Sequence, residues 1–127
     1  MIHDTMKSTP FLSRLYILNG HEPVRCESVT RWAEWFETAE RVIGYEWVGP
    51  AQVSTVFLGF DGHVVAEQPP LLFETVVHSG CLKGMMYRWS SWKEAEEGHA
   101  RTVGEVEVAE GLARDEAEGA PEGAPIH

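Results

Sequence analysis

Glu74, His78 and Arg88 are the residues whose types and spacing are most suggestive of chemistry. Glu74 is the only carboxylate in LLFETVVH (71–78), a segment that otherwise has the composition of a buried strand. The two-residue period of a strand places Glu74 and His78 on one face. A tight turn over 79–83 would bring Arg88 opposite Glu74. These side chains predict either a polar ligand site on a sheet face or a plain cross-strand ion pair, which stabilises a sheet by a few tenths to about 1 kcal/mol.

Asp61 and His63 form a second candidate pair, in a Gly-containing loop that follows an apolar segment. An Asp and a His near the end of a strand can bind a metal ion or act as acid and base. Asp-Gly is equally typical of an ordinary turn, and no HxH, HExxH or His/Cys set at ligand spacing accompanies the pair. Nucleophile elbows, P-loops and dinucleotide-binding motifs are missing from the sequence as well. We therefore predict no catalytic residue, no metal site and no cofactor, and keep both polar clusters as an alternative ligand-binding set.

His99 and the two cysteines have a structural interpretation. His99 lies on the apolar stripe of a predicted helix, which is typical of a packed histidine that holds a hydrogen bond. Cys26 and Cys81 are far apart in sequence, and neither has a neighbouring base. We expect two reduced thiols that behave as small hydrophobic side chains, although one disulfide is possible in an oxidising compartment.

Hydrophobic periodicity predicts the elements that must position these residues, in the order β-β-α-β-β-β-β-α. One helix is expected over 29–43, capped by Ser28, ended by Gly44 and covering a sheet face; the second is expected over 92–108. The predicted strands, of which the fourth is central, are 15–18, 23–26, 45–48, 52–60, 71–78 and 85–89, with Asn19-Gly20 as the first hairpin turn. Short hairpin connections favour antiparallel pairing. We therefore predict a single small α+β domain, mainly an antiparallel sheet of about five or six strands with two packed helices.

Charge and composition define the organisation of the chain and exclude several functions. The 127 residues include twenty acidic and ten basic side chains, a formal net charge of −10. This balance argues against direct binding to nucleic acid and to anionic membranes. No apolar run has the length of a membrane span, and residues 1–12 lack an apolar core of signal-peptide length, so we do not expect secretion. We expect a flexible arm over 1–12, a folded domain over 13–110, and an acidic Gly/Ala/Pro/Glu-rich tail over 111–127 that is disordered.

Surface residues of the second helix are candidates for binding a partner. Glu94, Glu97 and Glu105 lie on its outer side, where they can stand in for phosphates opposite a basic protein, or simply face water. The chain also has five tryptophans, which suit an aromatic core or, where a tryptophan is exposed, a homodimer interface.

Several linked segments are similar to a family of small, uncharacterised proteins encoded by phages and prophages. These segments are STVFLGFD (54–61), PPLLFETVVHSG (69–80), YRWSSWKEAEEGH (87–99) and the helical pattern WAEWFETA (32–39). The resemblance covers most of residues 15–103, although here Gly62 separates Asp61 from His63, where the family has a His directly after the Asp. It implies a phage or prophage origin and action in the cytoplasm of a bacterial host, and it brings no established activity.

Taken together, these observations favour a binding protein over an enzyme. Small accessory phage proteins without catalytic motifs often act by binding, so we expect an acidic, anti-CRISPR-like inhibitor of a host defence component. One alternative is a protein that sequesters a nucleotide signal, with Glu74, Arg88 and tryptophans in its pocket. Another is a metal-dependent hydrolase that uses Asp61, His63 and Glu74.

Overall fold

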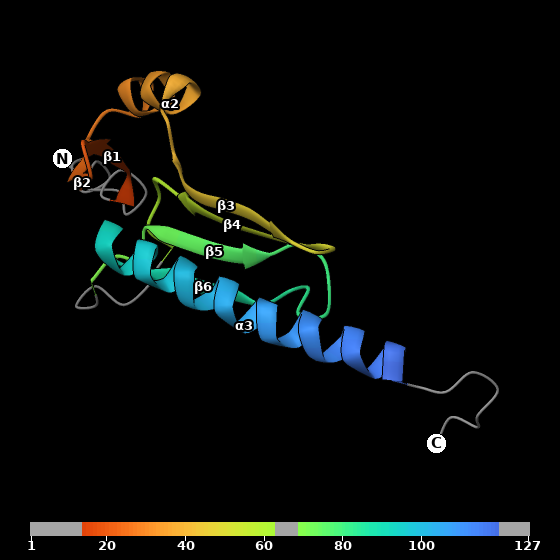
Figure 1. Cartoon of the computed structure of the whole chain (residues 1–127). Helices are drawn as coiled ribbons and strands as arrows, with labels where there is room; N and C mark the ends of the chain where they lie inside the picture. The colour runs from red at the N-terminus through yellow and green to blue at the C-terminus, as the bar shows by residue number, and fades with distance from the viewer. Residues whose placement is uncertain (1–13, 63–68, 120–127) are drawn as a thin grey trace.

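The computed structural model describes residues 14–62 and 69–119, and its elements follow the predicted order (Figure 1). They are β1 (Tyr16–Asn19), β2 (Glu22–Arg25), α2 (Val29–Thr38), β3 (Val42–Val48), β4 (Ala51–Phe57), β5 (Phe73–Val77), β6 (Met86–Trp89) and α3 (Trp92–Gly119). The α+β prediction is confirmed. The six strands are divided between two antiparallel sheets, a β1–β2 hairpin and a four-stranded sheet in the order β3-β4-β5-β6.

The β1–β2 hairpin turns one residue later than predicted. Asn19 pairs with Glu22, so the two-residue turn consists of Gly20 and His21 rather than Asn19 and Gly20. Gly20 has a φ of +65°, in the left-handed region that glycine adopts without the steric penalty of a Cβ atom. The turn therefore uses the same glycine that the sequence indicated, at its first rather than its second position.

The four-stranded sheet has one covered face and one open face. Along the central strand β4, residues alternate between fully buried and half-buried, because successive side chains point to opposite faces. The buried positions face α3 and define the covered face, which includes Val53, Thr55 and Phe57. The opposite, open face has no helix over it in the part of the chain that the structure describes (Figure 1).

Helix α3 covers the sheet and extends beyond the end predicted near residue 108. Its buried residues include Ala95, His99 and Val106 from the predicted apolar stripe, and the stripe continues to Glu110. The helix runs on to Gly119, past the ends of the strands (Figure 1), so the first nine residues of the predicted tail are helical. At 1.5 Å per residue its 28 residues span about 42 Å. Residues 120–127 of the predicted tail, and the predicted arm over 1–12, lie outside the described residues.

Helix α2 differs from its prediction in length and in position. It ends at Thr38, with Ala39 extended as its C-cap, and Gly44 lies inside β3 instead of ending the helix. The β-branched Val42 pairs with Val56 of β4, so sheet pairing prevails over the helical period at this point.

The expectation that the first helix covers a sheet face was wrong. Helix α2 has no fully buried residue and packs beside the β1–β2 hairpin, at one end of the four-stranded sheet (Figure 1). The Trp32 indole N–H lies 3.1 Å from the Tyr16 carbonyl oxygen and 2.9 Å from that of Gly59, and it donates to both. Neither α2 nor α3 is long and apolar enough to cross a membrane.

Candidate functional site

Glu74 and Arg88 form the cross-strand pair that the spacing predicted. Glu74 on β5 lies opposite Arg88 on β6, and Nε and a terminal nitrogen of Arg88 each lie 3.1 Å from Glu74 Oε2. The Arg88 side chain is 42% exposed and the Glu74 side chain 16%. The pair lies on the open face of the sheet, where an ion pair of this exposure contributes at most about 1 kcal/mol to stability.

His78 lies apart from that pair. Its Nε2 lies 2.8 Å from Ser54 Oγ on β4, while Gln52 hydrogen-bonds the Tyr45 hydroxyl at the neighbouring strand. The predicted cluster of Glu74, His78 and Arg88 is therefore one ion pair and one separate hydrogen bond on the same face. The polar side chains of the open face are paired with one another.

The Asp61 loop is described only in part, because His63 lies outside the described residues. Asp61 Oδ1 accepts a long hydrogen bond of 3.4 Å from the backbone N–H of Leu71, and the Asp61 N–H donates to the Arg14 carbonyl. Residues 14–62 and 69–119 contain no group of three or more His, Cys, Asp or Glu side chains arranged to hold a metal ion. The pairing of Asp61 with His63 stays a prediction.

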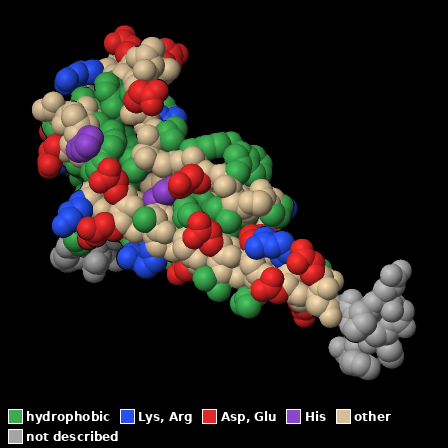
Figure 2. Space-filling model, viewed as in Figure 1, with side chains coloured by type: hydrophobic (Ala, Val, Ile, Leu, Met, Phe, Trp, Pro, Cys, Tyr) green, Lys and Arg blue, Asp and Glu red, His purple; other side chains and the backbone are tan. Residues whose placement is uncertain are grey.

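Exposed hydrophobic side chains gather on the open face. Val42, Tyr45, Trp47 and Met86 are 52–59% exposed and make up half of the large hydrophobic residues that are exposed in the described chain. Strand register places all four on the side of the sheet away from α3. Figure 2 shows hydrophobic side chains gathered over β3 and β4. We call these four residues the open-face patch.

All five tryptophans lie in the described residues, and Trp47 is the only one of them that is more than half exposed, at 59%. The other four are half-buried, and three of them pack against the core cluster formed by Phe57, Leu72, Phe73 and Ala95. Most of the tryptophans therefore pack against the core, and Trp47 is the one that is more than half exposed.

The three glutamates proposed to bind a partner are all engaged within the chain. Glu94 accepts hydrogen bonds from the backbone N–H and the hydroxyl of Ser90, and these bonds hold the pKa of Glu94 below its ordinary value. Glu97 pairs with Lys93 at 3.7 Å, one turn away. Glu105 accepts a 3.0 Å hydrogen bond from the Tyr87 hydroxyl, whose pKa is raised by desolvation and by that carboxylate. Their first role is local: Glu94 and Ser91 form the predicted cap of α3, and the other two have partners at the helix surface.

The C-terminal half of α3 has a different surface. Val108 and Leu112 are the two most exposed large hydrophobic residues described, at 63% and 65%. They are four residues apart, so they lie side by side on the helix surface. Glu105, Asp115 and Glu116 are within three or four residues of them and are exposed. Figure 2 shows this part of α3 as acidic and basic side chains with hydrophobic ones between them.

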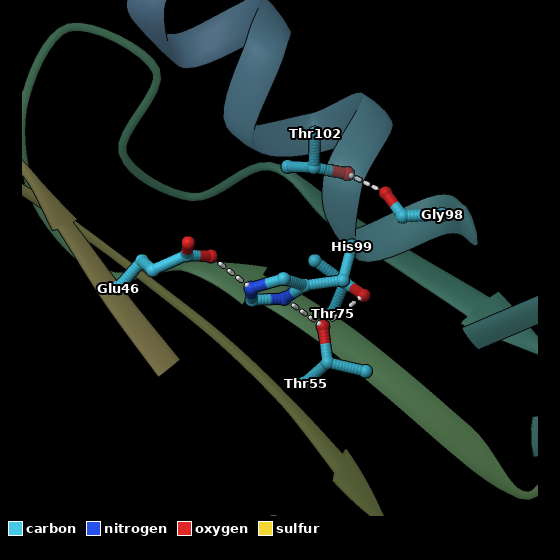
Figure 3. A network of polar contacts seen from close by, with 6 residues as sticks. All are labelled: Glu46, Thr55, Thr75, Gly98, His99 and Thr102. Atoms are coloured by element: carbon cyan, nitrogen blue, oxygen red, sulfur yellow. Dashed lines mark hydrogen bonds and ion pairs between the residues drawn. The ribbon is translucent and has the colours of Figure 1, made fainter. Parts of the chain in front are cut away.

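A buried chain of hydrogen bonds centred on His99 joins α3 to the covered face (Figure 3). His99 is 8% exposed; its Nδ1 lies 2.7 Å from Thr55 Oγ1, and its Nε2 lies 2.6 Å from Glu46 Oε1. Thr55 Oγ1 lies 2.6 Å from Thr75 Oγ1 on the next strand. The prediction of a packed, hydrogen-bonded histidine is confirmed.

One order of donors satisfies this whole chain. The Trp89 indole N–H can only donate, and it donates to Thr75 Oγ1 at 2.9 Å. With Thr75 donating to Thr55 and Thr55 donating to His99 Nδ1, the Nε2–H of His99 donates to the Glu46 carboxylate. Every polar hydrogen then has an acceptor, which assigns the Nε2-protonated tautomer to His99 from the donors and acceptors around it.

Glu46, His99 and Thr55 are the residue types of a carboxylate–imidazole–hydroxyl triad, but their setting is structural. Thr55 is fully buried, and its hydroxyl contacts both Thr75 and His99, so Oγ1 does not face a space that a substrate could enter. Gly44 permits this packing, because a Cβ there would lie 2.6 Å from His99 Nε2. The arrangement holds α3 at a fixed position on the sheet.

Glu110 makes a second attachment of α3, close to the turn between β5 and β6. It is 7% exposed, and its carboxylate accepts a 2.6 Å hydrogen bond from the backbone N–H of Cys81. Desolvation and the Glu110 carboxylate raise the pKa of the Cys81 thiol, which disfavours the reactive thiolate. Both cysteines are free; Cys26 is buried as expected, whereas Cys81 is exposed.

A cavity of about 520 Å³ lies at the start of α3. Trp92 lines it, with the His21 ring stacked on the indole at a centroid distance of 3.7 Å. Lys93 and Glu96 on α3 and Glu22 on β2 supply charges at its walls. Of the residues predicted for the ligand-binding alternative, Trp92 lines this cavity, whereas Asp61, Glu74, His78 and Arg88 do not.

The sequence patterns did not reveal the two carboxylates that attach α3 to the rest of the fold. Glu46 on β3 contacts His99, and Glu110 on α3 accepts a hydrogen bond from Cys81. Glu110 follows Val106 by four residues, so continuing the apolar stripe by one turn would have revealed it as a buried acid. Glu46 had no such signal, because its contact with His99 joins residues 53 positions apart in the chain.

Compared with protein-family models, curated proteins and solved structures, this chain has no significant match.

Proposed function

We propose that this protein is a non-enzymatic inhibitor that docks the C-terminal half of α3 against a basic surface of a host defence component. The observation that carries the proposal is the exposure of Val108 and Leu112, at 63% and 65%, on an acidic helix that extends past the sheet. Helices that bind in grooves of partners present apolar anchors at this spacing.

Charge supports a basic partner. From Gly104 to Gly119, α3 has six carboxylates and one basic residue, Arg114, and only Glu110 of the six is buried. Carboxylates around an apolar pair accelerate the encounter with a basic surface and set the orientation of docking. A basic surface in a defence complex is commonly one that binds nucleic acid, so the helix would occupy the place of phosphates.

The contacts of Glu94 and Glu97 within the chain lead us to place the docking surface in the C-terminal half of α3, rather than at its start. Glu94 caps α3 and Glu97 pairs with Lys93, so these carboxylates are already partly compensated. Glu105 stays in the proposed surface, since it lies one turn from Val108. The resemblance to phage and prophage proteins supports a target in a bacterial host.

Capture from a host lysate, followed by nucleic-acid competition, tests the proposal. The immobilised full chain should retain a nucleic-acid-binding protein at about 50 mM salt and release most of it at about 500 mM, because screening weakens contacts between exposed charges. The Val108→Ser/Leu112→Ser variant should lose at least about tenfold in affinity for the captured protein. Ala100→Ser, an exposed position of the same helix, is the matched control and should bind normally.

Two results would contradict the proposal. One is capture that the double serine variant leaves unchanged, because the apolar pair would then make no contact with the partner. The other is a captured protein that still binds its nucleic acid when saturated with this chain, because the two would then occupy different surfaces.

The cavity at the start of α3 favours a second candidate function, the binding of a small ligand such as a nucleotide. Its volume of about 520 Å³ is within the range of ligand sites, and Trp92 and Lys93 are residue types that stack on a base and attract a phosphate. A nucleotide at about 100 times its dissociation constant should stabilise the fold by about 2.7 kcal/mol in thermal unfolding. Absence of any shift across a set of mono-, di- and cyclic nucleotides would contradict this alternative.

A further inference from the structure

We propose that the open face of the four-stranded sheet binds a second copy of this chain, giving a two-fold symmetric dimer with both α3 helices on the outside. This inference is independent of the proposed function, because α3 lies on the other side of the sheet. It begins from the open-face patch, Val42, Tyr45, Trp47 and Met86, each more than half exposed.

The patch extends across the full width of the sheet. Val42, Tyr45 and Trp47 lie on the edge strand β3, and Met86 lies on β6 at the opposite edge. Val56 and Val76, on the two central strands, are half-buried between them. An apolar surface that continues from edge to edge is typical of a sheet that packs on another sheet, at a separation of about 10 Å.

The polar side chains of this face already make hydrogen bonds or ion pairs with one another. Glu74 is paired with Arg88, and Ser54 is hydrogen-bonded to His78. Gln52 donates to the Tyr45 hydroxyl. Burying a polar group is costly when it loses its hydrogen bond, and these groups keep theirs when water is removed.

Charge identifies the occupant as a second copy. The face carries one carboxylate, Glu74, and one guanidinium, Arg88, so its formal charge is zero in a chain whose net charge is −10. A basic partner gains no attraction from a neutral face. Two copies that meet here keep their acidic helices on opposite sides of the dimer, which minimises their repulsion.

The face is also complementary to itself. In a two-fold arrangement the same patch of both copies forms the interface. If one residue of the first copy contacts a second residue of the other, the reverse contact is also made. Glu74 of one copy can then face Arg88 of the other, so the charges that pair within the chain can also pair between chains.

The size of the face suits a dimer of moderate affinity. The four strands are 7, 7, 5 and 4 residues long, and at about 3.3 Å per residue and about 4.8 Å between strands they give a flat footprint of roughly 360 Å². Protruding Tyr45, Trp47 and Met86 increase the accessible area toward the roughly 800 Å² per partner of a standard interface. Association is therefore expected at micromolar concentrations.

Sedimentation equilibrium of the full chain from about 1 to 100 µM tests the inference, since small interfaces associate in this range. The mass should rise from 14.2 kDa toward twice that value. Trp47→Ser should raise the dissociation constant at least tenfold, whereas Leu112→Ser, on α3, should leave it unchanged. Circular dichroism and thermal unfolding confirm that each variant is folded.

Charge reversal provides a second test, which reports on the geometry. Glu74→Arg gives a face with two positive groups, and Arg88→Glu gives one with two negative groups. Each variant alone should stay monomeric at about 100 µM, whereas an equimolar mixture should form heterodimers, because opposite charges then meet across the interface.

Three outcomes would overturn the inference. They are a wild-type chain that stays at 14.2 kDa throughout, a dimer that Leu112→Ser dissociates and Trp47→Ser does not, and charge-reversed variants that fail to associate when mixed. The first leaves the capture experiment on α3 unaffected, so failure of the dimer and failure of the proposed function are distinguishable.

Discussion

The two faces of the four-stranded sheet are built from alternate residues of the same strands. They differ in the burial of their apolar side chains and in the way their polar side chains are hydrogen-bonded. On the covered face, Phe57 and Phe73 are fully buried under α3. On the open face, Tyr45 and Trp47 are more than half exposed. Local composition is therefore a poor guide to burial here, and the helix that lies above one face makes the difference.

The polar side chains of the two faces also differ in how they are connected by hydrogen bonds. On the covered face they form a continuous chain that runs from Trp89 through Thr75, Thr55 and His99 to Glu46 and joins α3 to all four strands of the sheet. On the open face they form separate pairs that join neighbouring strands only. The first arrangement positions an element of the fold, and the second leaves a neutral surface that a partner can cover.

The largest expected effect comes from matched truncations on the two faces. Phe73→Ala should lower the free energy of unfolding by about 3–5 kcal/mol, because it removes a buried ring that contacts Phe57 and Trp92. Tyr45→Ala, measured in urea at high dilution where the chain is monomeric, should cost less than about 1 kcal/mol, since its side chain already faces solvent. Equal losses at both positions would show that the open face is covered within the monomer.

A smaller effect is expected from one substitution made on the two sides of α3. Gly98 faces the sheet, and a Cβ there would overlap the Trp89 ring, whereas a Cβ at Gly104 meets nothing within 4 Å. Gly98→Ala should therefore destabilise by about 1–3 kcal/mol through overpacking. Gly104→Ala should stabilise by up to about 1 kcal/mol, because alanine is the better helix former.

Urea unfolding of these two variants checks the orientation of α3. Opposite signs at positions six residues apart in one helix are expected only if the first faces the sheet and the second faces solvent. Stabilisation by both alanines would contradict the packing of Gly98 against Trp89.

The smallest effect concerns the exposed start of α3. The Ser90 backbone N–H and hydroxyl hold the pKa of Glu94 below its ordinary value, so the ionised carboxylate favours the folded state. That contribution is present at neutral pH and is lost as the pH falls through the lowered pKa. Glu94→Gln should therefore cost less than about 1 kcal/mol near pH 7, and the difference from wild type should shrink toward about pH 3. Glu107→Gln, exposed in the same helix, is the control for the loss of one carboxylate charge.

Local patterns predicted a large part of this molecule. The alternation in LLFETVVH and the length of the following turn were enough to place Glu74 opposite Arg88, because strand period and hairpin register are short-range properties. The apolar stripe of the second helix identified His99 as a packed residue. Ser91 and Glu94 marked the start of that helix, since a cap is read within four residues.

Errors in the prediction arise where distant segments compete with a local pattern. The helical period of residues 29–43 continues through Ile43, but Val42 pairs with Val56 and draws the chain into β3 after Ala39. The Gly- and Glu-rich composition after residue 110 predicted a tail, whereas the helix continues to Gly119 beyond its attachment through Glu110. Val42 pairs with a residue 14 positions away, and Glu110 hydrogen-bonds a residue 29 positions away.

The sequence by itself determined the α+β class, the order of the elements, the Glu74–Arg88 register and the acidity of α3, because each depends on neighbours within a few residues. Only the tertiary structure decided which sheet face α3 covers, that Glu46 and Thr55 meet at His99, and that Trp47 is left exposed. The two-residue strand period is the same on both faces, so it does not determine which face of the sheet is buried. Packing of one helix selects between them.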